Sequence, residues 1–304
     1  MIKRLVLYST LRTVFSMSRF VPRVEIDGSN HYITVHPIEG KHSATMFLMH
    51  GLGDTADGWL DTAEEIVSRF PYIKIVLPTA ESRSVTLNMG AKMPAWYDIT
   101  GLTADRASED CDGLPESIAT IKSLMESENS IGISYKRMML GGFSQGGALT
   151  LATGLQLPVD KKPAGLLVMS GYLPAASKFN LTPGLEDVPI LHTHGDVDPV
   201  VQYNWAIQTK DAIISRGAKN YELKTYSRLG HGINQELLEY AQNYISRVLI
   251  DDPSLALKPK EFSEMSVKEL KIAIRNYGLA SQALGFSEKN EFVKLLEDYR
   301  TSKG

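Results

Sequence analysis

The sequence is poor in cysteine and lacks a long apolar run, and both absences exclude classes of protein. Cys111 is the one cysteine among 304 residues, so no intrachain disulfide can form and a reducing compartment is favoured. Cysteine cannot supply a metal site, and no histidine pair is spaced for one on a helix. The absence of a run of about 18 apolar residues predicts that no helix spans a membrane. The net charge of −3 gives no electrostatic basis for nucleic acid as the main ligand.

The first 24 residues are basic and contain no acidic side chain. The basic residues are Lys3, Arg4, Arg12, Arg19 and Arg23. An acid-poor, Arg-rich start resembles a mitochondrial transit peptide, and the alternative is a disordered tail. If residues 1–24 are a disordered tail, we predict a cytoplasmic protein. Mitochondrial targeting through residues 1–24 is the alternative.

Short apolar runs alternate with amphipathic stretches through most of the chain. The runs typical of buried strands are Tyr32–Val35, Ala44–Met49, Tyr72–Leu77, Arg137–Leu140, Ala164–Met169, Pro189–Thr193 and Tyr221–Tyr226. The stretches typical of helices are Thr62–Phe70, Leu114–Met125, Gln145–Leu155, Trp205–Arg216 and Gln235–Val248. This alternation predicts an α/β fold with a mainly parallel sheet flanked by helices. Ligands of such sheets bind beyond the carboxyl ends of the strands.

The pattern changes near residue 250, where proline and charged residues indicate a linker over 251–262. Ser266 and Glu269 have the spacing of a capping box at the start of one helix, and a second helix begins near Ser287. We expect an α/β domain over 25–250 and a small helical module over 263–304.

The segment Gly142-Phe143-Ser144-Gln145-Gly146 follows an apolar run and precedes a predicted helix. This context is typical of a nucleophile elbow, in which a strained turn raises the serine hydroxyl above the edge of the sheet. The helix N-terminus would stabilise the negative charge that develops there. We predict that Ser144 is a nucleophile.

A serine hydroxyl needs a base, and in this kind of fold the chain order is nucleophile, acid, histidine. Three histidines follow Ser144, and two of them, His192 and His194, lie in a predicted buried strand. His231 lies in a glycine-containing loop between the last predicted strand and a helix. We predict that His231 is the base.

The acid that orients the histidine must lie between residues 144 and 231, after the end of a strand. Asp196 and Asp198 both satisfy this condition, and their positions do not separate them. The aspartate that is not the acid would hold the turn through backbone hydrogen bonds.

The oxyanion of the reaction needs backbone N–H donors. One is expected from Gln145, directly after the nucleophile. The segment His50-Gly51-Leu52-Gly53-Asp54 follows an early strand, and its glycines permit close approach to a ligand. We assign the second donor to Leu52.

These segments together resemble the acyl-protein thioesterases of the phospholipase/carboxylesterase family of small α/β-hydrolases. The resemblance runs from about Ala44 to Val248. Its motifs are His50–Thr55 with Trp59, Thr86–Asn88, Met93–Asp98, Gly141–Ala148, Ser170 with Leu173-Pro174, and His194–Pro199.

The resemblance implies an α/β-hydrolase fold, Asp198 as the acid, His231 as the base, and Leu52 and Gln145 as oxyanion donors. It implies cleavage of the thioester between a palmitoyl-type chain and protein cysteine, with side activity on lysophospholipids and small esters. It also implies an acyl channel under a loop. The predicted channel residues are Leu87, Met89, Met93, Trp96 and Leu173. No metal and no organic cofactor is needed for this chemistry.

Three features depart from the family. Gly232 follows His231 where many relatives have serine, and the N-terminal palmitoylated cysteine of the family has no counterpart. The segment after residue 255 lies outside the family and resembles a SAP-like helical module over Ser266–Leu270, Tyr277-Gly278 and Glu288-Lys289. Such modules bind nucleic acid in some cases and protein in others, and the alternative is a solvated helical hairpin that packs only on its own chain.

The sequence therefore predicts a palmitoyl-protein thioesterase that acts as a monomer or weak dimer and makes transient contact with membrane surfaces. A carboxylesterase or lysophospholipase is the alternative among enzymes. The alternative outside enzymes is an inactive lipid-binding or adapter protein.

Overall fold

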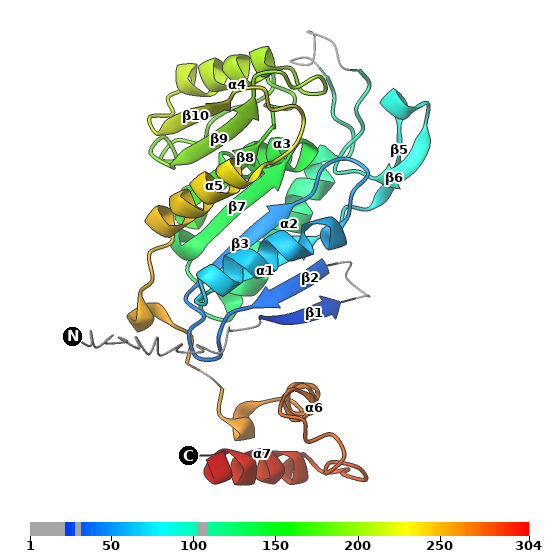
Figure 1. The fold of residues 1–304 in the computed structure, drawn as a ribbon, viewed down its shortest axis with the longest axis vertical. Helices are drawn as coiled ribbons and strands as arrows, with labels where there is room; N and C mark the ends of the chain where they lie inside the picture. Colours follow the sequence, from blue (N-terminus) through cyan, green and yellow to red (C-terminus); the bar gives the residue numbers. More distant parts are fainter. Residues whose placement is uncertain (1–21, 28–31, 102–108, 259, 304) are drawn as a thin grey trace, which may run out of the picture. The chain divides into compact units, whose positions relative to one another are not determined.

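Figure 1 shows the computed structural model, which describes residues 22–27, 32–101, 109–258 and 260–303. The chain folds into two compact units, and the division lies between Leu255 and Ala256. Most of the predicted tail or targeting segment 1–24 lies outside the described residues. Among the described residues, no helix is both long enough and apolar enough to cross a membrane.

The larger unit contains an eight-stranded sheet with the order β1-β2-β4-β3-β7-β8-β9-β10. Its strands are β1 (Arg23–Asp27), β2 (Tyr32–His36), β3 (Ala44–Met49), β4 (Ile73–Pro78), β7 (Met138–Phe143), β8 (Gly165–Met169), β9 (Ile190–Gly195) and β10 (Tyr221–Tyr226). From β4 to β10 every neighbouring pair is parallel, and β2 runs antiparallel to both β1 and β4. The α/β-hydrolase fold with a mainly parallel sheet is thus confirmed.

The helices of this unit cover both faces of the sheet (Figure 1). They are α1 (Leu60–Arg69), α2 (Leu114–Ser130), α3 (Gln145–Gly154), α4 (Tyr203–Ser215) and α5 (Gln235–Val248). Met46 of β3 packs in one cluster with residues of α1 and α5, whereas its neighbour Thr45 contacts α2. Successive side chains of a strand point to opposite faces, so α1 and α5 cover one face and α2 covers the other.

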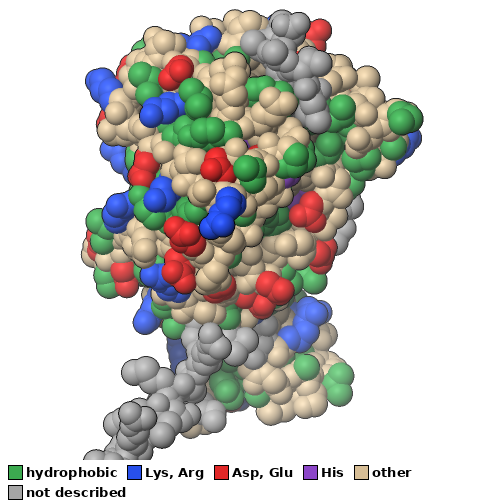
Figure 2. Space-filling view, turned by 45° about the horizontal axis from the view of Figure 1, so that its top comes forward, with side chains coloured by type: hydrophobic (Ala, Val, Ile, Leu, Met, Phe, Trp, Pro, Cys, Tyr) green, Lys and Arg blue, Asp and Glu red, His purple; other side chains and the backbone are tan. Residues whose placement is uncertain are grey.

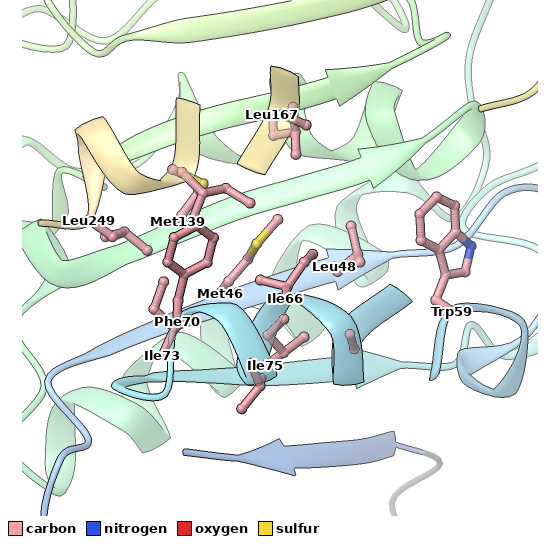
Figure 3. Close-up of a cluster of buried hydrophobic side chains, with 14 of the residues drawn as sticks. Met46, Leu48, Trp59, Ile66, Phe70, Ile73, Ile75, Met139, Leu167 and Leu249 are labelled. Carbon is pink, nitrogen blue, oxygen red and sulfur yellow. The ribbon is translucent and has the colours of Figure 1, made fainter. Parts of the chain in front are cut away.

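The core on the α1 and α5 face is formed by large aliphatic and sulfur-containing side chains (Figure 3). Met46 and Leu48 of β3, Met139 of β7 and Leu167 of β8 belong to the same cluster as Ile66 of α1, and all are almost fully buried. Two apolar residues at alternate positions on β3 supply this face, as the two-residue period of a strand requires.

Three strands of the structure are not among those predicted from the sequence. The edge strand β1 has mostly exposed or half-buried residues, so it lacks the apolar run that marks buried strands. The short hairpin β5 (Ser82–Val85) and β6 (Ala91–Pro94) mixes polar and apolar residues and forms a separate two-stranded sheet. Its turn contains Met89 with φ of 55°.

The second unit consists of α6 (Val267–Asn276) and α7 (Lys289–Lys303) with their flanking turns. The predicted capping box between Ser266 and Glu269 is present at the start of α6. The buried core of this unit is Phe262, Leu270, Ile274, Leu279, Phe292 and Leu296.

On the face of the molecule shown in Figure 2, acidic and basic side chains are interspersed rather than gathered by sign.

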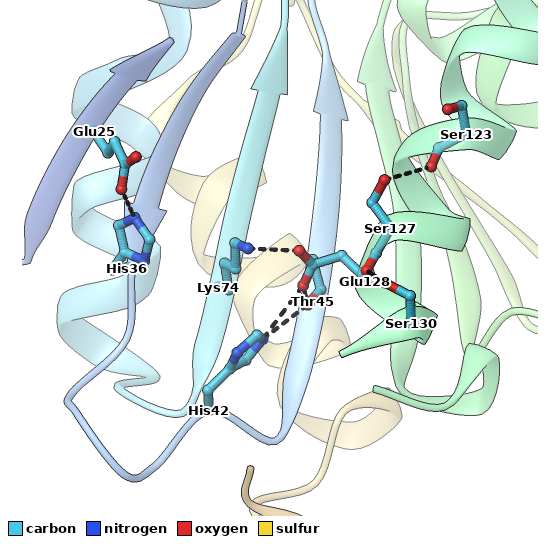
Figure 4. Close-up of polar contacts among 9 residues, drawn as sticks. All are labelled: Glu25, His36, His42, Thr45, Lys74, Ser123, Ser127, Glu128 and Ser130. Carbon is cyan, nitrogen blue, oxygen red and sulfur yellow. Dashed lines mark hydrogen bonds and ion pairs between the residues drawn. The ribbon is translucent and has the colours of Figure 1, made fainter. Parts of the chain in front are cut away.

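A buried polar cluster fastens α2 to the sheet at the amino ends of β3 and β4 (Figure 4). Glu128 accepts hydrogen bonds from Thr45 Oγ1 at 2.7 Å and from Lys74 Nζ at 2.5 Å. Because the hydroxyl proton of Thr45 goes to Glu128, the Thr45 oxygen accepts from His42 Nε2 at 3.0 Å. Burial lowers the pKa of His42 to about 4, although Glu128 acts in the opposite direction.

This cluster predicts that acid destabilises the protein through His42. The unfolded chain binds a proton at His42 near the ordinary pKa of 6.5, whereas the folded protein does so only near 4. The free energy of unfolding should therefore fall as the pH drops below 6.5, by about 2 kcal/mol at pH 5 for this group. Urea unfolding of the wild type and His42→Gln at about pH 7.5 and 5 measures this. The variant should lose less stability between the two pH values, and equal losses would contradict the assignment.

Candidate active site

Ser144 occupies a sharp turn between the carboxyl end of β7 and the start of α3. Its φ of 54° and ψ of −117° are strained values for a residue with a side chain. A Cβ atom at position 142 would lie 2.3 Å from the backbone of Gly146, and one at Gly146 would lie 2.2 Å from the Met49 carbonyl oxygen. Only glycine fits at both positions, and their close packing holds the serine in the elbow.

The ring of His231 lies between Ser144 and Asp198. His231 Nε2 is 2.9 Å from Ser144 Oγ, and His231 Nδ1 is 2.8 Å from Asp198 Oδ2. A carboxylate only accepts, so Nδ1 carries the proton and Nε2 is free to accept from the serine hydroxyl. The structure thus brings together the three residues that the sequence assigned to the triad, from loops after β7, β9 and β10.

The structure also shows which of the two candidate aspartates contacts His231. Asp198 is buried, and its Oδ1 accepts hydrogen bonds from the backbone N–H groups of Val200 and Val201, each at 2.9 Å. Burial opposes ionisation, but the hydrogen bonds from His231 and the two backbone groups outweigh it and hold the pKa of Asp198 below its ordinary value. Asp196 is exposed and accepts from the backbone N–H of Arg228 at 2.6 Å. Asp196 therefore fastens the turn that precedes His231.

The loops that carry Asp198 and His231 touch through their backbones. Asp196 N donates to Tyr226 O at 3.0 Å, and Val197 N donates to Leu229 O at 3.3 Å. A Cβ atom at Gly195 would lie 2.0 Å from the Leu229 carbonyl oxygen. The missing side chain at Gly195 is what allows this approach.

Leu52 and Gln145, the predicted oxyanion donors, line the same cavity as Ser144. Gln145 begins α3, so its backbone N–H has no partner within the helix. Its side chain accepts from Trp96 N at 2.9 Å and donates to Tyr97 O at 2.7 Å, which ties the elbow to the segment after β6. The sequence analysis predicted a role only for the backbone of Gln145. It did not predict the bracing role of the Gln145 side chain, for which the available signal was an amide side chain directly after the nucleophile.

His50 braces the loop that carries Leu52. Its Nε2 accepts from Ala80 N at 2.9 Å, so its Nδ1 carries the proton and donates to Gly51 O at 2.6 Å. Trp96 Nε1 donates to the carbonyl oxygen of His50 at 2.9 Å. Burial lowers the pKa of His50, and a neutral ring is the form that these two bonds require.

The cavity in front of Ser144 has a volume of about 250 Å³. Its walls beside the triad are mainly apolar and include Leu87, Ile99, Tyr172, Val200 and Val201. The last four are not among the residues predicted from the sequence, although Val200 and Val201 closely follow the acid. Among the described residues, no group of three or more His, Cys, Asp or Glu side chains is placed to hold a metal ion.

Of the five predicted channel residues, the structure places only Leu87 in the wall of this cavity. Met89 is fully exposed at the turn between β5 and β6, and the half-buried Met93 contacts Asn88 through its sulfur. Trp96 and Leu173 are buried elsewhere, held by bonds from Trp96 Nε1 to His50 and from Leu173 N to Thr209.

Residues 30–249 match the phospholipase/carboxylesterase family. Acyl-protein thioesterase 1 homolog 1 of Dictyostelium discoideum is 40% identical over 210 residues, which cover 68% of this chain and 92% of that protein. Acyl-protein thioesterase 1 of Neurospora crassa is 37% identical over 239 residues, which cover 75% of this chain and 95% of that protein. The crystal structure of Zea mays acyl-protein thioesterase 2 aligns with a TM-score of 0.64 and 29% identity, covering 72% of this chain and 98% of that one.

The glycines around the triad provide a matched pair of variants. Gly195→Ala should separate the loops of Asp198 and His231, because its Cβ atom would meet Leu229 O at 2.0 Å. Gly232→Ala should be tolerated, because nothing lies within 4 Å of a Cβ atom there. We expect a loss of roughly 100-fold or more in kcat/KM for a p-nitrophenyl ester in the first variant, since a misplacement of about 1 Å costs that much. Full activity in Gly195→Ala would show that the contact is not needed.

Proposed function

Because the chain belongs to the phospholipase/carboxylesterase family and is a hydrolase of the thioesterase and carboxylesterase kind, we propose that it is an acyl-protein thioesterase. In this proposal it cleaves the thioester between a long-chain fatty acyl group, such as palmitoyl, and a cysteine of another protein. The observation that carries it is the position of the His231 ring, within hydrogen-bond distance of both Ser144 and Asp198.

The first step is attack of Ser144 Oγ on the carbonyl carbon of the thioester. Its proton moves to His231 Nε2, which accepts it from 2.9 Å. The imidazolium that forms is stabilised by the Asp198 carboxylate, which is kept ionised and fixed by two backbone N–H groups. The negative charge on the former carbonyl oxygen is stabilised by the backbone N–H groups of Leu52 and Gln145.

The tetrahedral intermediate then collapses and its carbon–sulfur bond breaks. The proton on His231 goes to the departing sulfur, so the protein product leaves as a cysteine thiol and the acyl group stays on Ser144. A water molecule then attacks this ester and gives its proton to His231, which passes that proton to Ser144 Oγ as the fatty acid leaves. Every proton that moves passes through one imidazole nitrogen, Nε2.

The apolar walls of the cavity support an acyl group as the part of the substrate that is recognised. Leu87, Ile99, Val200 and Val201 present no charge to it, and burial of a methylene chain against such residues contributes about 0.8 kcal/mol per CH₂. A carboxylesterase or lysophospholipase would use the same walls and the same triad, and is the second candidate. An inactive lipid-binding protein would not need the hydrogen bond between Ser144 and His231.

The other expectations for this chain stay predictions. They are a protein partner for the helices of 263–304, transient contact with a membrane surface, a monomer or weak dimer, and a cytoplasmic location with mitochondria as the alternative. The SAP-like character of residues 263–304 and the binding roles of Met89, Met93, Trp96 and Leu173 belong with them.

Matched oxyester and thioester substrates with acyl chains of increasing length test the proposed function. We expect kcat/KM for the thioesters to rise with chain length until the apolar walls are filled, because each added methylene is removed from water. Ser144→Ala should abolish turnover of both series while its unfolding curve stays close to that of the wild type. Turnover of oxyesters alone would favour the carboxylesterase, and turnover by Ser144→Ala would contradict both candidates.

A further inference from the structure

Two histidines that the mechanism does not use lie in the interior of the sheet next to the triad. His192 and His194 of β9 have no exposed surface, and neither does the side chain of Asp198. The two histidines are two residues apart, so they point to the same face of the sheet, and His192 Nε2 is 3.2 Å from His194 Nδ1. Tyr221 of the neighbouring strand β10 places its hydroxyl 2.7 Å from His192 Nδ1.

The proton positions along this row of side chains follow from its last acceptor. His194 Nε2 lies 2.7 Å from the carbonyl oxygen of Val201, which can only accept, so Nε2 carries the proton. In a neutral ring His194 Nδ1 must then accept, and the donor is His192 Nε2. His192 Nδ1 must accept in turn, and its donor is the hydroxyl of Tyr221. The three residues therefore form one directed chain of hydrogen bonds from Tyr221 to Val201.

Burial favours the protonation states that these hydrogen bonds require. It lowers the pKa of His192 and of His194, which keeps both rings neutral. It raises the pKa of Tyr221, which keeps the hydroxyl proton on the oxygen. The titratable groups that face His194 are His192, Asp198, His231 and, from α4, the ring of Tyr203.

The chain of hydrogen bonds ends on the segment that carries the acid of the triad. Val201 donates its N–H to Asp198 Oδ1 and accepts from His194 through its carbonyl oxygen. His194 Nε2 is also 3.5 Å from Asp198 Oδ2, the oxygen that accepts from His231. The same segment supplies Val200 and Val201 to the cavity wall. One imidazole N–H is thus bonded to the residue that donates to the carboxylate and that also lines the cavity.

We propose that His194 is a positioning residue for hydrolysis, which holds the Asp198–Val201 segment through its Nε2–H, and that His192 and Tyr221 fix its tautomer. This inference rests on the proposed function and deepens it. If His192 reversed its tautomer, two lone pairs would face each other at the 3.2 Å contact with His194. If His194 reversed as well, a lone pair would face the Val201 carbonyl oxygen. The buried row therefore admits one proton order, and that order leaves a donor facing the acid segment.

His194→Leu, His194→Gln and the control His42→Leu test this inference by the pH profile of kcat/KM. His42 is also a buried histidine, but it lies at the opposite end of the parallel strands, beside Thr45 and Glu128. We expect kcat/KM of His194→Leu to fall roughly 10- to 100-fold, which is the typical cost of removing a residue that orients a metal-binding side chain. Its acid limb should move to lower pH, because a displaced Asp198 stabilises the protonated form of His231 less.

The glutamine variant separates positioning from packing. The side-chain amide of His194→Gln can still donate to Val201 O, so it should recover most of the activity and the wild-type acid limb. His42→Leu should lose stability while its acid limb stays unchanged. A folded His194→Leu protein with wild-type kcat/KM and acid limb would overturn the inference. A glutamine variant as impaired as the leucine variant would also overturn the role of Nε2–H.

Tyr221→Phe keeps the inference testable if His194→Leu does not fold, because it removes a single oxygen remote from the substrate. Loss of that donor should lower kcat/KM roughly 5-fold and move the acid limb in the same direction as in His194→Leu. An unchanged pH profile of kcat/KM in Tyr221→Phe would overturn the role of the hydrogen bonds that run from Tyr221 to Val201. Failure of the proposed function is distinguished by the wild type, which would then not hydrolyse acyl thioesters, or by activity of Ser144→Ala.

Discussion

The hydrogen bond from His231 to Asp198 depends on two loops that approach each other at the carboxyl edge of the sheet. The loop after β9 carries the acid and the loop after β10 carries the base, and their backbones meet where Gly195 faces Leu229. Because β9 and β10 are parallel neighbours, both loops leave the sheet at the same edge. Ser144 reaches that edge from β7, so the His231 ring lies within hydrogen-bond distance of both Ser144 and Asp198 there.

Much of the polar structure around the triad holds main-chain segments in place. The His50 ring braces the loop of Leu52, the Gln145 amide ties the elbow to the segment after β6, and Asp196 fastens the turn before His231. The proposed role of His194 follows the same pattern for the acid segment. The strained φ of Ser144 at 54° persists because glycines pack against it and these braces fix the elements on both sides.

Sequence reasoning predicted the parts of the molecule whose signals are local. The buried parallel strands are short apolar runs, and the elbow is a glycine-flanked serine between a strand and a helix, so both were placed to within a few residues. The edge strand β1 and the hairpin of β5 and β6 mix polar and apolar residues and lack such runs.

Residues that meet only through the tertiary fold were harder to predict. The order of nucleophile, acid and base limited the acid to Asp196 or Asp198. Position in the chain did not distinguish the two, and Asp198 was assigned only through the family resemblance. In the folded structure Asp198 is buried and Asp196 is exposed, which is a difference that a residue's position does not reveal. The cavity walls were missed in large part, because Tyr172, Ile99 and Val200 come together from distant parts of the chain.

If the triad works as proposed, the hydroxyl of Ser144 is activated by the neighbouring His231. Reaction with a fluorophosphonate, followed by mass spectrometry of the intact protein and its peptides, measures this most directly. We expect one adduct, located on the peptide that contains Ser144 and suppressed by a competing long-chain acyl thioester. An adduct on another serine, or an unmodified Ser144 in the folded protein, would contradict the proposed activation.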